Sequence, residues 1–262
     1  MLIELSIYLL TGAIVGFFAG LLGIGGGLIL VPILTTVFVS YLDSPHLVHI
    51  AIGTSLATIL VTSLSSVKTH HRHQAVRWDI FRLLVVGMFV GGILGAWIAQ
   101  FMNASVLSKT FAVLELLIAM KMLLNYQPNP LRKLPSRPVA LMASSLIGML
   151  STLVGVGGGA INTPYMVWHN VPMKHAIATS AALSLPIAVA GTTGFIWAGW
   201  GLADLPSYSS GYVYWPAFFG IILTSYFTAP IGANLTHQLP VKRLKKVFAV
   251  LLILLAIKMF LF

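Results

Sequence analysis

Two glycine-rich breaks interrupt this very apolar chain, and the sequence around them repeats. Residues 23–27 (GIGGG) form the first break, and residues 155–159 (GVGGG) form the second. A matching segment follows each break, IGTS at residues 52–55 and IATS at residues 177–180. Unwound backbone inside a membrane must line a cavity or be buried in protein, because lipid cannot satisfy its hydrogen bonds. A broken apolar helix repeated in each half is typical of secondary transporters.

Composition places the chain in a membrane. Hydrophobic residues make up 58% and charged residues only 8%, whereas soluble domains carry about 25% charged residues. Several apolar stretches reach about 20 residues, which is enough to cross a hydrocarbon core of about 30 Å. We therefore predict an all-α integral, multi-pass membrane protein with the lipid bilayer as its surroundings.

Other function classes find little support. The net charge of +10 comes from basic residues in short loops between apolar runs, where the positive-inside rule puts them, so we expect no nucleic-acid partner. The motifs H-E-x-x-H, G-x-S-x-G and G-K-[ST] are missing, and so is cysteine. We therefore expect no enzyme activity, no cofactor and no metal site. The run HHRH at residues 70–73 is interpreted as part of a solvated basic loop or a patch that faces lipid head groups.

The repeat defines the expected organisation. We predict one membrane domain over residues 1–262, with repeat 1 at 1–125, a linker at 126–138 and repeat 2 at 139–262. In each repeat a glycine-broken re-entrant helical hairpin precedes three transmembrane helices. The first repeat is expected at 3–39, 48–68, 80–102 and 106–124, and the second at 139–168, 176–199, 214–235 and 243–261.

Charge favours an inverted arrangement of the two repeats. If each broken segment starts and ends on one side, 13 of the 15 basic residues fall inside the cell and only Lys109 and Lys258 fall outside. If each broken segment crosses the membrane once, only nine basic residues fall inside the cell and six fall outside. The positive-inside rule therefore favours inverted repeats with both termini outside. Two nearly full crossings in the first hairpin would give the same sides.

In this arrangement the two glycine loops enter from opposite faces and meet near the midplane. A short half-helix starts after each loop, with Pro32 and Pro164 expected in or near its first turn. The free N–H groups and positive dipole end of such a helix suit a small anion. The alternative is that the glycines only permit close helix packing. The predicted substrate-binding backbone comprises Gly25, Gly26, Gly27, Leu28, Gly157, Gly158, Gly159 and Ala160.

Hydroxyl and amide side chains complete the predicted site. Thr54, Ser55 and Thr58 lie on one polar stripe of the helix after the first loop, and Thr179 and Ser180 occupy matching places in the second half. These hydroxyls can donate to an anion, or else bond to their own helix or a neighbouring one. Asn162 follows the second loop, where the first half has a leucine. It can orient substrate, cap the helix or bond to another helix.

Glu115 is an acidic residue in the middle of an apolar helix, and its counterpart in the second half is Leu252. A carboxyl group at that depth is costly to ionise and marks a functional candidate. Proton coupling and a neutral or paired structural role are both open at this point.

The sequence resembles the TauE/SafE family, also called TSUP, of sulfite and organosulfonate transporters over essentially its whole length. The resemblance rests on residues 16–27 (GFFAGLLGIGGG) with Pro32, on their repeat at residues 148–164, and on AIGTS at residues 51–55. Residues 70–79, which end in VRWD, resemble the family's loop after that helix. The resemblance implies transport of a small sulfur-containing anion such as sulfite or an organosulfonate, often outward, across a prokaryotic plasma or inner membrane.

Alternatives to this function remain open. The chain could carry another small organic anion, act as a channel, or bind an anion in the membrane as a sensor or enzyme without moving it. The sequence does not specify the transport direction, the coupling ion or whether the chain forms a homo-oligomer.

Overall fold

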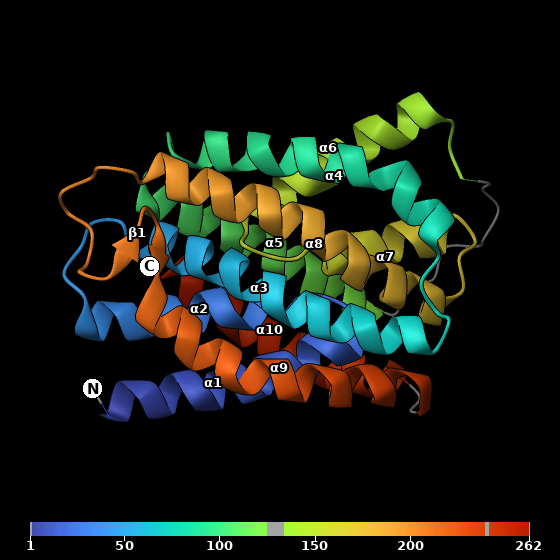
Figure 1. Ribbon diagram of the computed structural model, residues 1–262, viewed down its shortest axis with the longest axis horizontal. Helices are drawn as coiled ribbons and strands as arrows, with labels where there is room; N and C mark the ends of the chain where they lie inside the picture. Colours follow the sequence, from blue (N-terminus) through green and yellow to red (C-terminus); the bar gives the residue numbers. More distant parts are fainter. Residues whose placement is uncertain (1, 125–133, 239–240, 262) are drawn as a thin grey trace.

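The computed structural model describes residues 2–124, 134–238 and 241–261, which form ten helices and one short hairpin (Figure 1). The first-half helices are α1 (Leu2–Leu22), α2 (Gly27–Tyr41), α3 (Leu47–Arg72), α4 (Trp78–Ala99) and α5 (Ala104–Leu124). The second-half elements are α6 (Arg137–Leu153), α7 (Gly159–Trp168), α8 (Met173–Ala198), β1 (Ser209–Ser210), β2 (Val213–Tyr214), α9 (Trp215–Gln238) and α10 (Val241–Phe260). The predicted linker lies largely outside the described residues.

Five of the described helices are long and apolar enough to cross a membrane. They are Ile3–Leu22 in α1, Leu47–Arg72 in α3, Trp78–Ala99 in α4, Met173–Ala198 in α8 and Trp215–Thr236 in α9. These helices run roughly along the long axis of the molecule (Figure 1). The protein is therefore an all-α membrane protein, as predicted.

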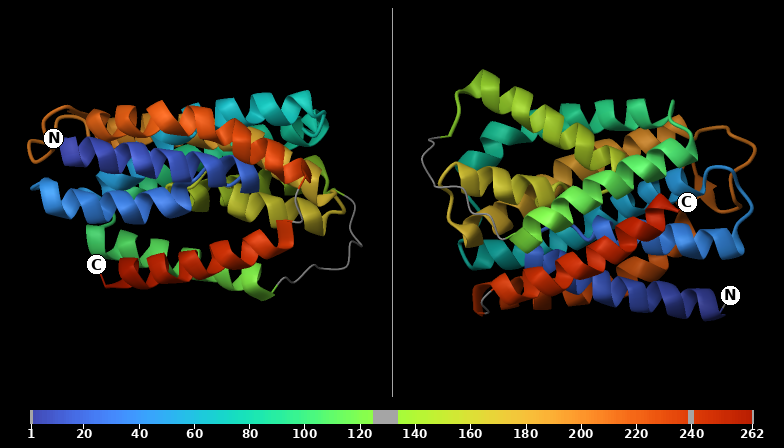
Figure 2. Two further views of the ribbon diagram at one scale, coloured as in Figure 1. Left: turned by 90° about the horizontal axis from the view of Figure 1, so that it is seen from below. Right: turned by 180° about the vertical axis from the view of Figure 1, so that it is seen from behind.

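The two broken segments reach the centre of the bundle from opposite ends. The N-terminus, the end of α2 and the C-terminus lie at one end of the molecule, and the start of α6 and the end of α7 lie at the other (Figures 1 and 2). Helix α1 has 21 residues, so it is about 31 Å long at 1.5 Å per residue. That length fits a nearly full crossing of the membrane. Helix α7 has only 10 residues, which is too few for a crossing. Whether these segments are re-entrant hairpins in an inverted repeat stays a prediction.

Helices of the two halves pack in exchanged pairs. Helix α1 packs against α9 and α6 packs against α4, while α3 packs against α8 and α5 against α10. Each of these pairs takes one helix from each half. The two halves therefore pack into one another and do not form separate bundles. The division of one domain into residues 1–125 and 139–262 remains a prediction.

Glycine faces bring the pairs α1–α9 and α4–α6 unusually close together. Helix α1 presents Gly12, Gly16 and Gly20 to α9, and α4 presents Gly87, Gly91 and Gly95 to α6. A Cβ atom on Gly16 would lie 2.6 Å from Ser225 Cα, and one on Gly95 would lie 2.5 Å from the Met149 carbonyl oxygen. Such faces hold membrane helices together through close backbone contact, because burial of apolar surface gives no advantage within lipid.

Three local features differ in detail from the expectations or were not expected. The prolines at 32 and 164 lie inside α2 and α7, in the sixth helical position, which is near the first turn but just beyond it. The hairpin of β1 and β2 was not predicted, because two-residue strands carry no periodic pattern. His70 is not solvated: it is fully buried at the end of α3, and its Nε2 lies 3.3 Å from the Gly20 carbonyl oxygen.

Candidate functional site

The same backbone geometry starts the half-helix after each glycine loop. Gly26 caps α2 with φ 85° and ψ −9°, and Gly158 caps α7 with φ 76° and ψ −12°. This left-handed conformation is strained for residues with a Cβ atom and freely available to glycine. The loops therefore turn sharply into their helices in both halves.

The two glycine loops touch each other in the interior. A Cβ atom on Gly25 would lie 3.1 Å from Gly157 Cα. A side chain on Gly27 would overlap the Gly155 carbonyl, and one on Gly159 would overlap the Gly23 carbonyl. Residues 21–31 and 151–159 are all buried. The structure thus brings the two predicted backbone segments together and leaves no room for side chains between them.

Each half-helix begins with backbone N–H groups that have no acceptor within the helix. In α2 the N–H groups of Ile29 and Leu30 donate to Gly26 O over 3.2 and 3.1 Å. In α7 those of Ile161 and Asn162 donate to Gly158 O over 3.0 and 2.7 Å. The N–H groups before them, at positions 27–28 and 159–160, lie at the positive end of the helix dipole. They are suited to an anion.

The second loop carries buried polar side chains that lack partners. Asn162 is fully buried, and neither its Oδ1 nor its Nδ2 has a hydrogen-bond partner among the described residues. Ser151, on α6, is 1% exposed, and its hydroxyl is also without a partner there. Measured from a Cβ placed on Gly158, Asn162 Nδ2 is 2.9 Å away and Ser151 Oγ is 3.2 Å away. Leaving such groups unpaired is costly, so this corner is suited to a polar ligand.

The first loop lacks this polar corner. The repeat places Leu30 where α7 has Asn162, and Ala19 where α6 has Ser151. A Cβ atom on Gly26 would lie 3.4 Å from the Ala19 methyl group. The sequence-based prediction missed Ser151. The available signal was the joint change from alanine and leucine in one repeat to serine and asparagine in the other.

Serine hydroxyls bind the carbonyl groups of the second loop. Ser55, on α3, donates to Gly155 O over 2.8 Å, so a residue of the first half holds the loop of the second. Ser184, on α8, donates to Gly157 O. Thr58 instead donates to Ser55 O in its own helix, over 2.7 Å. The loop carbonyls are thus held by hydroxyls, which leaves the N–H groups as the ligand-facing candidates.

The matching threonines join the two halves. Thr54 Oγ1 accepts a hydrogen bond of 3.0 Å from the N–H of Tyr214, which precedes α9. Thr179 Oγ1 accepts one of 2.9 Å from the N–H of Arg77, which precedes α4. Each threonine thus fixes the start of a helix in the other half. Ser180 is also engaged, because its hydroxyl accepts a bond of 2.9 Å from Thr163.

Glu115 lies on α5, which packs against α10. It is fully buried, and neither carboxyl oxygen has a hydrogen-bond partner within the described ranges. An ionised carboxylate without a donor or counter-charge is costly to bury, which keeps Glu115 a functional candidate.

A comparison with protein-family models matches residues 8–259 to the model described as sulfite exporter TauE/SafE. The chain belongs to the TauE/SafE family. This membership agrees with the resemblance seen in the glycine-rich segments. The matched region covers nearly the whole chain.

Related proteins carry the names of transporters. A "Probable membrane transporter protein" of Haemophilus influenzae is 40% identical over 97% of this chain and 97% of its own length. "Probable membrane transporter protein YunE" of Bacillus subtilis is 25% identical over 95% of this chain and 94% of its own. A further relative of that kind in Methanocaldococcus jannaschii is 25% identical over 93% and 91%. No solved structure matches the chain.

These findings confirm the predicted class. This TauE/SafE protein is a multi-pass membrane transporter and not an enzyme.

Proposed function

We propose that this protein carries a small sulfur-containing anion, such as sulfite or an organosulfonate, and binds it beside the second glycine loop. The observation that carries the proposal is the fully buried, unpartnered amide of Asn162 at the start of α7. The N–H groups at positions 159–160 and the hydroxyl of Ser151 supply further donors on the same corner. Sulfite and sulfonate oxygens accept hydrogen bonds from all of these groups.

The neutral character of this corner favours release as well as binding. Among the described residues, no lysine or arginine side chain is buried. An anion would therefore be held by amide, hydroxyl and backbone dipoles, spread over several donors. Such donors act strongly in a dry site, yet they lack the full charge that would slow the departure of the anion.

The exchanged helix pairs support transport by two inverted repeats. In such proteins, one repeat rocks against the other around a fixed midplane site. The loops meet between hairpins that come from opposite ends of the bundle (Figure 1). The buried contact of Gly25 with Gly157 corresponds to a closed arrangement, which opens on one side at a time.

We further propose outward transport, with Glu115 carrying a proton inward as the anion moves outward. Moving one negative charge out of a cell gains about 2.3 kcal/mol per 100 mV of membrane potential, inside negative. A buried carboxyl group without partners can take up and release a proton only when its surroundings change. Helix α5, which carries Glu115, packs against α10 of the other half, so a movement between the halves would change those surroundings.

Flux into proteoliposomes tests the proposal. We expect transport of sulfite or a small sulfonate in a screen that also includes sulfate, thiosulfate, taurine and simple carboxylates. Ser151→Ala and Asn162→Leu should both reduce that flux, whereas Asn103→Leu, at an exposed helix cap outside the site, should not. Absence of flux for every anion, or equal flux in all variants, would refute the proposed substrate class or the site, respectively.

A further inference from the structure

A groove with two arginines opens where α4 and α6 begin. It has a volume of about 620 Å³. It is lined by Asp79, Arg82, Leu83, Val86, Arg137 and Leu141. One arginine comes from each helix, and three of the six lining side chains are aliphatic.

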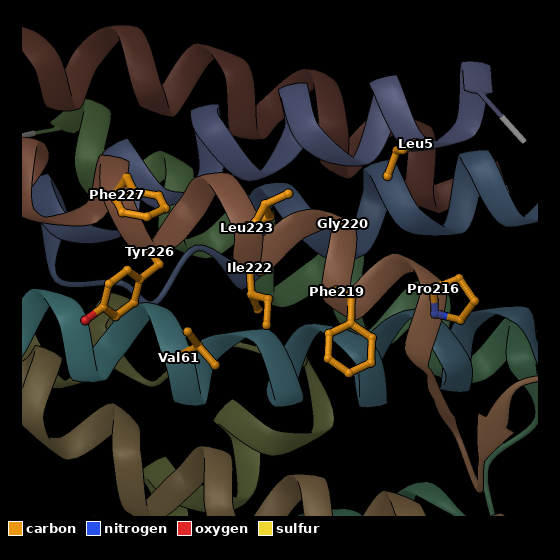
Figure 3. A pocket seen from close by; sticks show the side chains of 9 residues that line it. All are labelled: Leu5, Val61, Pro216, Phe219, Gly220, Ile222, Leu223, Tyr226 and Phe227. Carbon is orange, nitrogen blue, oxygen red and sulfur yellow. The ribbon is translucent and has the colours of Figure 1, made fainter.

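A second groove of about 650 Å³ lies between α1, α3 and α9, and its lining is almost entirely apolar (Figure 3). It is lined by Leu5, Val61, Pro216, Phe219, Gly220, Ile222, Leu223, Tyr226 and Phe227. In Figure 3 the side chain of Leu5 on α1 lies across from the row of residues on α9.

The two grooves occupy equivalent places in the repeat. Helices α4 and α9 both begin with tryptophan, so their residues can be matched from that position. The residues of α1 and α6 can be matched from the glycine loop that follows each of them. In this register Arg82 corresponds to Phe219, and Arg137 corresponds to Leu5. The helix pairing therefore creates a groove in each repeat, and only one of the two carries charge.

The charge in the first groove is not cancelled by its acidic residue. Asp79 is engaged by Arg77, whose Nε and Nη2 donate to its two carboxylate oxygens over 2.9 and 2.7 Å. Within the described ranges, neither Arg82 nor Arg137 has an ion-pair partner. Two guanidinium groups are thus left facing one space, at the positive ends of two helices.

The rest of the groove is suited to an acyl chain. Val86 is 59% exposed and Leu141 is 43% exposed, so both present apolar surface to the bilayer. A molecule that fills this groove needs an anionic head beside the arginines and a hydrocarbon tail along the aliphatic side chains. Arginine pairs in basic pockets between membrane helices suit phosphate head groups in this way.

We propose that the groove between α4 and α6 is a binding site for an acidic phospholipid. Its phosphate lies between Arg82 and Arg137, and one acyl chain follows Leu83, Val86 and Leu141. The positive-inside rule alone accounts for basic residues near this surface. It does not account for one arginine on each wall of a groove whose equivalent in the other repeat is apolar. The proposal is independent of the transported substrate.

Lipid binding to the purified protein, measured by native mass spectrometry, tests it. Phosphatidylglycerol and phosphatidylcholine with identical acyl chains serve as probes. Removing both arginines with Arg82→Leu and Arg137→Leu should weaken phosphatidylglycerol binding about tenfold or more, given the contribution of each basic residue near a membrane surface. Phosphatidylcholine binding should change little. The control Lys68→Leu with Arg72→Leu removes the same charge from exposed positions on α3 and should leave both affinities unchanged.

Two further arms separate the alternatives. Inorganic phosphate in large excess should fail to displace phosphatidylglycerol, since it lacks the acyl chain. Complete displacement by phosphate would identify an anion site and overturn the lipid proposal. Equal loss of phosphatidylglycerol in the α3 control would also overturn it, by showing that only overall charge matters. Conversely, Leu5→Arg with Phe219→Arg should give the second groove a preference for phosphatidylglycerol.

Discussion

Replacement of Asn162 by leucine should move stability and substrate binding in opposite directions. Leucine is the residue at the equivalent position of the first repeat, Leu30. The amide of Asn162 is fully buried, and neither polar atom has a partner in the described part of the chain. An unpaired buried polar group costs about 1–3 kcal/mol. We therefore expect Asn162→Leu to raise the free energy of unfolding by about that amount.

Binding should weaken in the same variant. Loss of one hydrogen-bond donor to a desolvated anion costs about 1–3 kcal/mol, which corresponds to a roughly 5- to 150-fold higher dissociation constant. Thermal unfolding can be followed through the six tryptophans, since the chain has no cysteine for thiol-reactive dyes. Binding is measured on the same preparations, with sulfite and with the best substrate from the flux screen.

The inverse substitution provides the control. Leu30→Asn places an amide at the equivalent position of the first repeat, where Leu30 is fully buried, so it should lower stability by about 1–3 kcal/mol. A loss of stability in Asn162→Leu would show that the amide has a structural partner. Unchanged substrate affinity in that variant would remove Asn162 from the binding site. Either result would refute the reasoning above.

Three other predictions address coupling, the joints between the halves and topology. Glu115→Gln should fold and transport, but its flux should no longer respond to a pH gradient; an unchanged response at normal protein levels would make Glu115 a structural residue. Thr54→Val and Thr179→Val should each lower the free energy of unfolding by about 1–3 kcal/mol, because each leaves a helix-starting N–H group without its acceptor; thermal unfolding that matches the parent protein would contradict this role. Single cysteines at Ser136 and Ser207 should be labelled from the inside and the outside of the cell, respectively, and the reverse pattern would exclude the proposed topology.

The sequence predicted the helices well and their side-chain partners poorly. Helices α3 and α5 lie within a few residues of their expected bounds, because long apolar runs between polar loops define them directly. The partner of Thr54 is Tyr214, which is 160 residues away in the chain. A polar stripe on one helix cannot reveal such a partner. It also cannot tell a hydroxyl such as that of Thr58, which bonds to its own helix, from one that faces a ligand.

The candidate site shows the same limit. The repeat itself pointed to the glycine loops and to Asn162, because each could be compared with its counterpart. Ser151 escaped notice because it precedes the loop on α6 and comes near Asn162 only once the chain has folded. The two-residue strands before α9 were not predicted because they are too short to carry a periodic pattern, although Tyr212 between them packs against Phe195 and His49.

The close pairing of α1 with α9 has a consequence for how the chain is made. The glycine face of α1 emerges from the ribosome about 200 residues before α9, the helix that covers it. At usual rates of synthesis, the interval is roughly ten to forty seconds. During that time Gly12, Gly16 and Gly20 face lipid or the insertion machinery instead of their final neighbour. Helix α1 therefore stays without its final neighbour until α9 has been made, and nascent chains stalled before α9 should remain open to other helices with small-residue faces.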